Sequence, residues 1–505
     1  MKSDVGKVYL IGAGPGDPGL ITLRAIEMLE SADVVLYDYL ANPAVLDHAG
    51  ENAELVCLGR HGHGRLLSQD EINSRMVAAA QSGKRVVRLK CGDPAVFART
   101  AQETEALESA NVPFEIVPGV TAALAVGSYA GVSLTHRENA SAVALVTGQE
   151  TDAKQKPAID YARLASFPGT IVVYMGVTTA EHWTSQLIAG GRSADTPATI
   201  VRRCSWPNQV TYPCTLGTVA TVLAENRVRP PAIVIVGDVA GEVSESTWFT
   251  ERPLFGRRVV VTRPASQTRE IRKRLAELGA DVLIQPAIEI TAPDDWSPVD
   301  DAIQRIDEFD WLVFSSANGV RFFVDRLTSL RGDVRPLAAV KIAAIGTRTS
   351  EALAEYHLCA DLVPDEFRAE SLADSLVSAD GAAGKKFLLV RASRGREILA
   401  ETLTAARAEV EQIVVYRSTD VTSLDNDIAA AFDERSIDWI TVSSSAIARS
   451  LVALAGERLN HCRMASISPI TSDTLRELGF EPAAEAKTYT MDGIVEAILE
   501  AEQEQ

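Results

Sequence analysis

A loop rich in glycine and proline near the start of the chain has residues suited to a ligand site. GAGPGDPG (12–19) follows an apolar run at 8–11 and precedes an amphipathic helical pattern that begins after Thr22. A turn this tight needs glycine and proline. A dinucleotide fingerprint, G-x-G-x-x-G, is not matched, because Asp17 stands where its third glycine is needed. The loop therefore predicts a site at the carboxyl end of a strand, or a structural turn, rather than a nicotinamide or flavin site.

Two aspartates at the ends of expected strands could do polar or proton-transfer chemistry. Asp93, within Cys91-Gly92-Asp93-Pro94, could accept a hydrogen bond from a ribose hydroxyl or an ammonium. Gly92 would let a ligand approach the backbone closely. Asp38 follows the apolar run at 34–37, and a carboxylate there could collect a proton. An Asp-Pro turn is the alternative for Asp93, and a helix cap or turn is the alternative for Asp38.

Hydroxyl side chains recur at matched positions in the second half. DWLVFSSANGVRFF (310–323) resembles DWITVSSSAIARSL (438–451), and KIAAIGTRTSEALAEYHL (341–358) resembles RMASISPITSDTLRELGF (463–480). Each segment reads as a strand that leads into the start of a helix, where free N–H groups can bind an anion. The candidate substrate-binding residues are Ser316, Thr349, Ser445 and Thr471. Simple helix capping is the alternative for each of them.

These residues would be positioned by alternating strands and helices. Strand-like runs from residue 7 to 239 alternate with amphipathic helices, as a parallel or mixed sheet requires. The expected strands are 8–11, 34–37, 86–89, 114–117, 142–147, 170–174 and 233–236. The polar, proline-bearing stretch 242–256 predicts a linker. A strand at 259–262 and a helix at 268–278 then begin a second α/β unit.

Composition limits the classes of function. The 505 residues exceed one ordinary domain, and 46% hydrophobic with 23% charged residues is typical of a soluble globular protein. The net charge of −19 argues against non-specific nucleic-acid binding. The six cysteines lack the spacing of a zinc site, so we expect no metal and a reducing compartment. No apolar run approaches the ~20 residues of a membrane span, and the N-terminus lacks the pattern of a leader. We therefore expect a cytoplasmic protein.

The first half resembles the tetrapyrrole methyltransferases, and specifically the uroporphyrinogen-III C-methyltransferases. Beyond the opening 7–40, the resemblance rests on QDEIN (69–73), RLKCGDPAVFAR (88–99), VPGVTAALAVGSYAGVSLTHR (117–137), VVYMG (172–176) and PAIVIVGDV (231–239). It implies a two-lobed methylase fold over 1–241 and S-adenosyl-L-methionine as methyl donor to a pyrrole carbon. It also implies a homodimer formed through this half.

The same resemblance implies roles for individual residues. The implied cofactor contacts are Pro15, Gly92, Asp93, Val96, Thr121, Ala122 and Met175. Asp38 matches the family's proposed base. Arg60 replaces a lysine taken as a proton donor, and a guanidinium is better suited to holding a substrate carboxylate. Cys91 replaces a glycine of the usual GGDP, and Cys204 stands where a glycine would contact the cofactor.

The second half resembles uroporphyrinogen-III synthase. The segments that carry this resemblance are VTRPASQ (261–267), FSSANGV (314–320), AIGTRTSEAL (344–353), LLVRASRGREIL (388–399) and VVYRS (414–418). The family fold implies two α/β subdomains that face each other across a cleft, 257–288 with 419–505 and 289–418, with chain crossings at 287–291 and 416–420. Tyr416 matches the family's tyrosine near the leaving hydroxyl. Arginines at strand ends could bind substrate carboxylates bidentately, or could simply be solvated: Arg263, Arg391, Arg394, Arg396 and Arg417.

The two resemblances support each other because the product of the second activity is the substrate of the first. Together they predict a bifunctional enzyme that cyclises hydroxymethylbilane to uroporphyrinogen III and methylates it to precorrin-2. Its partners would be small-molecule tetrapyrroles, with no nucleic acid and no membrane. Two alternatives remain open: a methyltransferase for a later corrin precursor, and a non-catalytic tetrapyrrole-binding first half fused to an active synthase.

Overall fold

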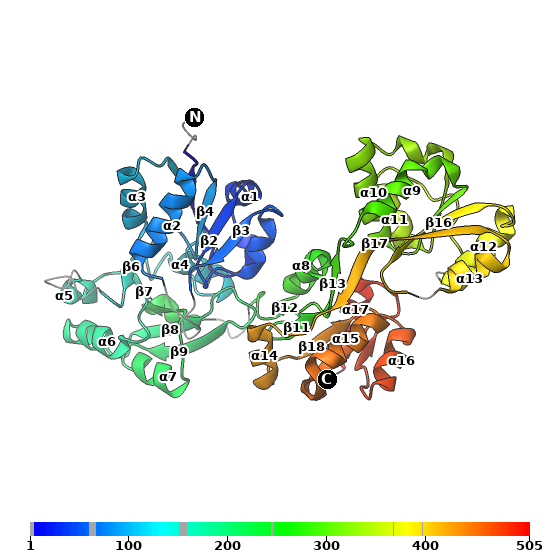
Figure 1. The fold of residues 1–505 in the computed structure, drawn as a ribbon. Coiled ribbons are helices and arrows are strands. Elements are labelled where there is room, and N and C mark those ends of the chain that lie inside the picture. Colours follow the sequence, from blue (N-terminus) through cyan, green and yellow to red (C-terminus); the bar gives the residue numbers. More distant parts are fainter. Residues whose placement is uncertain are drawn as a thin grey trace. The chain divides into compact units, whose positions relative to one another are not determined.

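The protein is described by a computed structural model that covers residues 5–59, 67–150, 159–243, 247–366, 368–395 and 397–504. The chain forms two compact units, one of residues 1–259, 271–282 and 502–505 and the other of residues 260–270 and 283–501. The described residues contain four five-stranded sheets with helices packed on them (Figure 1). The fold is of the α/β class, as the alternating sequence pattern predicts.

The first sheet is parallel and has the strand order β3-β2-β4-β1-β5. Its strands are β1 (Val8–Gly12), β2 (Val34–Tyr37), β3 (Glu54–Cys57), β4 (Val86–Lys90) and β5 (Phe114–Val117). Its helices are α1 (Leu23–Glu30), α2 (Gln69–Gln81) and α3 (Thr100–Ser109). Ile11 packs with α1 on one face, whereas Leu10 packs with α2 and α3 on the other. The central strands are therefore buried on both sides, which their nearly continuous apolar runs require.

The second sheet is mixed and has the order β6-β7-β10-β8-β9. Its strands are β6 (Val143–Thr147), β7 (Thr170–Tyr174), β8 (Pro197–Arg202), β9 (Val210–Thr215) and β10 (Ala232–Val236). Only β6 and β7 pair in parallel among them. Its helices are α4 (Ala122–Tyr129), α5 (Tyr161–Ala165), α6 (Ala180–Ala189) and α7 (Val219–Glu225). Val172 packs against α4 and Val173 against α6 and α7, so this sheet is also covered on both faces.

Part of the expected linker, 242–256, is packed. Phe249 is only 2% exposed and joins the core that α4 forms with the second sheet. Its ring lies 4.7 Å from that of Tyr129, and the Trp248 indole N–H donates to the Ser128 carbonyl at 2.8 Å. Aromatic residues in an otherwise polar stretch explain the difference, because their burial outweighs the flexibility that the composition suggests.

The second half contains the two remaining sheets, and the chain passes from one to the other and back. The first, β12-β11-β18-β19-β20, is built from β11 (Arg258–Val261), β12 (Asp281–Ile284), β18 (Trp439–Val442), β19 (Arg463–Ser466) and β20 (Ala484–Glu485). The second, β13-β17-β16-β14-β15, is built from β13 (Ile288–Thr291), β14 (Trp311–Phe314), β15 (Lys341–Ala344), β16 (Lys386–Ala392) and β17 (Glu409–Asp420). The two crossing strands, β13 and β17, pair antiparallel.

Helices cover these sheets as they cover the first two. Those that precede or follow the strands of the β12-β11-β18-β19-β20 sheet are α8 (Arg269–Glu277), α14 (Asn426–Asp433), α15 (Ser445–Ala455), α16 (Pro469–Glu477) and α17 (Met491–Gln503). The helices of the β13-β17-β16-β14-β15 sheet are α9 (Ser297–Gln304), α10 (Ala317–Arg331), α11 (Thr347–Glu355), α12 (Ala369–Asp380) and α13 (Ile398–Ala405). Separate apolar cores lie around each sheet. The expected repeat thus corresponds to β14-α10 with β15-α11 and to β18-α15 with β19-α16.

Candidate active sites

Three loops meet backbone to backbone at the carboxyl edge of the first sheet. Gly14 and Gly92 exchange N–H···O bonds of 3.2 and 2.8 Å. A Cβ on Gly12 would lie 2.5 Å from the Gly92 oxygen and 2.6 Å from the Gly119 Cα. These glycines are therefore required for packing as well as for turning the chain. The arrangement leaves backbone groups, rather than side chains, at the centre of the edge.

Asp93 ties two of these loops together. Its Oδ1 accepts a hydrogen bond from the Ala95 N–H at 2.7 Å, and its Oδ2 accepts one from the Gly119 N–H at 2.9 Å. The first bond is the Asx turn that the Asp-Pro alternative predicts. The second joins the loop after β4 to the loop after β5. Asp93 therefore organises the edge whether or not it also touches a ligand.

Two apolar side chains stand exposed in strained backbone conformations. Met175 is 48% exposed with φ of 50°, and Phe97 is 42% exposed with φ of 51°. The Phe97 ring lies 5.0 Å from that of Tyr174. Left-handed backbone costs about 1–3 kcal/mol at a residue other than glycine, and such residues cluster at functional sites. Phe97 lies in the loop after β4 and Met175 directly follows β7, and both side chains present apolar surface to solvent.

The other implied cofactor contacts are more enclosed. The Thr121 hydroxyl is buried and lies 2.6 Å from the Tyr174 hydroxyl, and Ala122 is half-buried. Pro15 is buried and its carbonyl accepts the Trp206 indole N–H at 3.1 Å, while Val96 is half-buried. Cys204 lies in the core with its thiol buried, which raises its pKa to about 12. The Cys204 side chain therefore belongs to the apolar core rather than to an open site.

Asp38 is held by an arginine of the neighbouring strand. Asp38 follows β2, and its Oδ1 accepts a hydrogen bond from Arg88 Nη2 at 2.7 Å. Its side chain is 32% exposed, whereas Arg88 is buried. Asp38 also lies close to Cys91, whose pKa is raised to about 12 by burial and secondarily by the charge of Asp38. The expected base therefore stands at the same edge as the glycine loops. Arg60 lies outside the described residues.

In the second half, Arg263 and Tyr416 are linked through two amide side chains. Arg263 Nη2 donates to Gln267 Oε1 at 2.6 Å, and Gln267 Nε2 donates to Asn318 Oδ1 at 2.8 Å. The Tyr416 hydroxyl lies 3.1 Å from Ser316 Oγ. Burial raises the pKa of Tyr416, and hydrogen bonds with Ser316 and Asn318 oppose that rise. The structure thus brings an arginine and a tyrosine into one polar network.

Arg263 differs from the other candidate arginines in its surroundings. Burial lowers its pKa to about 10, with further lowering by the neighbouring charges of Arg348 and Arg321. A carboxylate would relieve this concentration of positive charge. Ion pairs within the protein engage the others: Arg391 with Glu397, Arg394 with Asp420, and Arg417 with Asp294. Arg396 lies outside the described residues.

The hydroxyl residues of the repeat do not play equal roles. Ser316 caps α10 by accepting from the Gly319 N–H at 3.0 Å, and it also meets Tyr416. Its counterpart as a cap is Ser444, which accepts from Ile447 N–H, whereas Ser445 shares a hydrogen bond with Thr474. Thr349 and Thr471 are both buried in the first turns of their helices, α11 and α16. Ser316 is therefore the one member of this set that joins the Arg263–Tyr416 network among the described residues.

Comparison with known proteins decides the family. The family model for tetrapyrrole (corrin/porphyrin) methylases matches residues 7–220, and the model for uroporphyrinogen-III synthase HemD matches residues 269–496. The porphyrin biosynthesis protein HemD of Ruminiclostridium josui is 32% identical, over 98% of this chain and 98% of its own. The chain belongs to the family that fuses uroporphyrinogen-III C-methyltransferase to uroporphyrinogen-III synthase.

Other relatives match one part of this fusion enzyme more than the other. A uroporphyrinogen-III C-methyltransferase of Bacillus subtilis is 35% identical over 71% of this chain and 74% of its own. The solved uroporphyrin-III C-methyl transferase of Thermus thermophilus complexed with S-adenyl homocysteine is 40% identical over 46% of this chain and 98% of its own, with a TM-score of 0.40. A mutant uroporphyrinogen III synthase of the same organism is 17% identical over 49% of this chain and all of its own, with a TM-score of 0.38.

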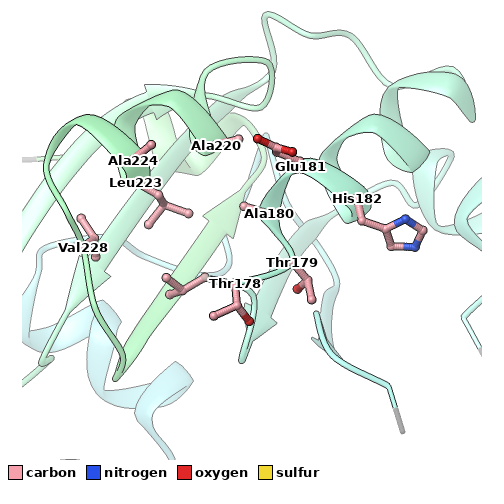
Figure 2. Close-up of a pocket in the computed structure, with 10 residues that line it drawn as sticks. Thr178, Thr179, Ala180, Glu181, His182, Ala220, Leu223, Ala224 and Val228 are labelled. Carbon is pink, nitrogen blue, oxygen red and sulfur yellow. The ribbon is translucent and has the colours of Figure 1, made fainter. Parts of the chain in front are cut away.

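A separate cavity in the methylase half lies apart from these residues. It measures about 630 Å³ and is formed by the loop before α6, the start of α6, and α7 with the loop after it (Figure 2). Its walls are mostly Ala, Val, Leu and Thr side chains, with Glu181 and His182 at the start of α6. None of the expected site residues lines it. The cavity is therefore not the expected cofactor pocket.

Sequence reasoning missed several polar residues of both sites. Arg88 and Lys90 alternate with Leu89 in a buried strand, a pattern that requires a nearby carboxylate. That carboxylate is Glu103. Gln267 and Asn318 stand inside the quoted synthase motifs, but nothing in those motifs marks them as site residues.

Among the described residues no helix is long and apolar enough to cross a membrane, and no cluster of His, Cys, Asp or Glu is arranged to bind a metal.

Proposed function

We propose that the enzyme cyclises hydroxymethylbilane to uroporphyrinogen III in its second half and methylates that product to precorrin-2 in its first half. The observation that best supports the methylation is the position of Asp38. Its carboxylate is held by Arg88 and stays partly exposed at the edge where the glycine loops meet. A fixed, accessible carboxylate at an edge formed by backbone groups suits the removal of a ring proton.

The residues at this edge fit S-adenosyl-L-methionine as methyl donor. The exposed Met175 and Phe97 supply apolar surface for an aromatic base, and the loops joined by Gly14 and Gly92 supply backbone groups for its polar parts. Asp93, Thr121 and Ala122 would shape the pocket from behind. When bound, this cofactor supplies a methyl group on a sulfonium, which is electrophilic enough to react with a pyrrole carbon.

The chain's own contribution to methylation is orientation and proton removal. Bringing two bound reactants into line can supply several kcal/mol, up to about 7–11 in the best cases. Asp38 would then accept the proton that the methylated ring must lose. Arg60, which is always charged, would hold a carboxylate of the tetrapyrrole rather than donate a proton.

The synthase chemistry would be carried by the Arg263–Tyr416 network. Arg263 would bind a substrate carboxylate, which would offset the repulsion from Arg348 and Arg321. Tyr416 carries its proton at neutral pH, as a tyrosine ordinarily does, and could donate it to the leaving hydroxyl; burial raises its pKa further. The small-molecule tetrapyrroles are the proposed partners; the homodimer stays a prediction, which sedimentation of the full chain would test.

The deciding experiment is the complete reaction of the full chain with hydroxymethylbilane and S-adenosyl-L-methionine. We expect uroporphyrinogen III without the cofactor, and a product with the methyl count of precorrin-2 when it is present. Chromatography resolves the isomer and mass spectrometry counts the methyl groups. Methylation only of a later corrin precursor, or no calorimetric binding of the cofactor, would contradict the proposal for the first half.

A further inference from the structure

Four charged side chains form a buried cluster beneath the methylase site. Glu103 of α3 accepts from Arg88 Nε through Oε1 at 3.0 Å and from Lys90 Nζ through Oε2 at 2.5 Å. Arg88 and Lys90 are each 3% exposed, and Glu103 is fully buried. Arg88 reaches onward to Asp38, which completes the cluster. The cluster therefore runs from the interior of the sheet to its carboxyl edge.

The charges of this cluster balance only when Asp38 is counted. Arg88 and Lys90 carry two positive charges, and Glu103 carries one negative charge. Burial lowers the pKa of Lys90, and the neighbouring charge of Arg88 lowers it further, against the opposing effect of Glu103. A buried cation needs a carboxylate partner. Asp38 supplies the missing negative charge and is the one member that reaches the surface of the site.

Arg88 is fixed in three directions at once. Its Nε donates to Glu103, its Nη1 donates to the Leu89 carbonyl at 3.0 Å, and its Nη2 donates to Asp38. A planar guanidinium with these bonds cannot rotate without breaking one of them. The direction of the Asp38 carboxylate is therefore set by a group that is itself immobilised by the core of the sheet.

We propose that Arg88 is a positioning residue that aims the Asp38 carboxylate at the substrate. This inference rests on the proposed methyltransferase function and adds to it a residue that does not itself touch the substrate. Glu103 orients Arg88 through its Oε1, and Lys90 binds the other oxygen of the same carboxylate. The proposal requires that Arg88 affects methylation only through Asp38, and this requirement distinguishes a positioning role from a general structural one.

The test is a double-mutant cycle in the full chain. Arg88→Met removes the hydrogen bonds and leaves the Lys90–Glu103 pair intact. We expect the turnover number for methylation to fall by about 10–100-fold, because a misplacement of about 1 Å can cost that much. We expect the Michaelis constant for uroporphyrinogen III and the calorimetric dissociation constant for S-adenosyl-L-methionine to change by less than about threefold. In an Asp38→Asn background, Arg88→Met should lower the turnover number by less than a further factor of about two, because the effects of coupled residues are not additive.

Two further variants control the result. Arg24→Met breaks a surface arginine–carboxylate pair with Glu115 in the same half, which shares no residue with the Asp38 cluster, and should leave turnover unchanged. Arg88→Lys keeps the buried charge but lacks the planar fork, so it should fold even where Arg88→Met does not. It should retain cofactor binding and recover only part of the rate.

Separate outcomes overturn the two proposals. Suppose that the wild-type enzyme is active and that the rate losses of Arg88→Met and Asp38→Asn multiply in the double variant. That result would show that Arg88 does not act through Asp38. A turnover number in Arg88→Lys equal to that of the wild type would likewise show that positioning Asp38 does not require the planar guanidinium. A wild-type protein that neither binds the cofactor nor methylates uroporphyrinogen III would overturn the methyltransferase function itself, and the role of Arg88 with it.

Discussion

At the scale of single residues, the candidate sites consist of side chains that are already engaged with the protein. Both oxygens of Asp93 accept backbone N–H groups, and the Thr121 hydroxyl meets Tyr174. Such bonds cost a site nothing in reorganisation when a ligand arrives. They also mean that a substitution acts on the shape of the site before it acts on any ligand contact.

We predict that Asp93→Ala weakens cofactor binding by about 1–3 kcal/mol, because two backbone N–H groups lose a charged acceptor and the loops after β4 and β5 separate. Calorimetry with S-adenosyl-L-methionine measures the change, and synthase activity should be retained. Asp425→Ala is the matched control, since Asp425 caps α14 through the Asp427 N–H in the other half. Equal cofactor affinity in wild type and Asp93→Ala would reduce Asp93 to a turn residue.

Tyr416→Phe should lower the rate of uroporphyrinogen III formation by the ~10²–10⁴-fold typical of a lost general acid. The substitution keeps the ring that stacks on Phe322, so the fold should hold. Tyr356→Phe removes a comparable hydroxyl, one that donates to Asp325 at 2.7 Å, and serves as the control. A Tyr416→Phe enzyme with wild-type turnover would show that the proton comes from elsewhere.

At the scale of elements, most apolar strands of the first half were predictable, whereas the polar edge strands β3 and β9 and the buried central strand β8 were not expected. The expected strands at 34–37, 114–117 and 170–174 coincide with β2, β5 and β7. By contrast, β3 is mostly exposed, and β9 is an edge strand that contains Pro213. Neither shows the continuous apolar run that marks a strand buried between helices. Pairing with β2 stabilises β3, and pairing with β8 stabilises β9.

The same limit explains which parts of the sites could be predicted. Sequence patterns identified Asp38 and Asp93 because each follows a strand, whereas Tyr416, which lies inside β17, was indicated by the family resemblance. The partner of a side chain depends on the register between strands, so the 50-residue separation of Arg88 and Asp38 could not be bridged without the fold. Likewise, nothing in the spacing of Arg391, Arg394 and Arg417 shows that each faces a carboxylate.

The junction of the three glycine loops yields a prediction about elements. In Gly12→Ala the new methyl group would meet backbone atoms of Gly92 and Gly119, which cannot move without separating β1 from its neighbours. We expect a loss of about 1–3 kcal/mol or more in unfolding free energy, as for other overpacked sites, together with weaker cofactor binding. Gly127→Ala, inside α4, should be tolerated, because the nearest atom to the new Cβ is the Val132 carbonyl oxygen beyond the helix, at 3.4 Å. Chemical denaturation of both variants measures the difference.

At the scale of the whole molecule, each half has its own sheets and its own apolar cores, although residues 271–282 and 502–505 group with the first compact unit. The methylase half contains the cores around α1, around α2 and α3, around α4, and around α6 and α7. Those of the synthase half are built from residues beyond 258. A chain of this kind should divide into two folded pieces if the cut spares every core. The position of the cut is the remaining question.

We predict that the chain separates after Gly256 and not near Glu245. The segment from 247 to 255 belongs to the methylase core, because Phe249 packs on Tyr129 and Thr247 Oγ1 donates to the Tyr129 carbonyl at 3.2 Å. These contacts support the C-terminal end of α4, whose first turn carries Ala122 of the candidate site. Residues 1–256 should therefore bind the cofactor and methylate uroporphyrinogen III, and residues 257–505 should cyclise hydroxymethylbilane.

A fragment of residues 1–245 should be less stable than one of residues 1–256 by about 3–5 kcal/mol, the cost of deleting a buried phenylalanine side chain. Phe249→Ala in the full chain reproduces that loss without a cut and separates the effect of the ring from that of a free chain end. Trp248→Ala, at a residue that is 53% exposed, is the matched control and should cost much less. Melting temperatures of the fragments and variants measure these differences. Equal stability of the two fragments would mean that the packing of Phe249 contributes nothing to the methylase core, and would move the boundary back to the position that composition alone suggests.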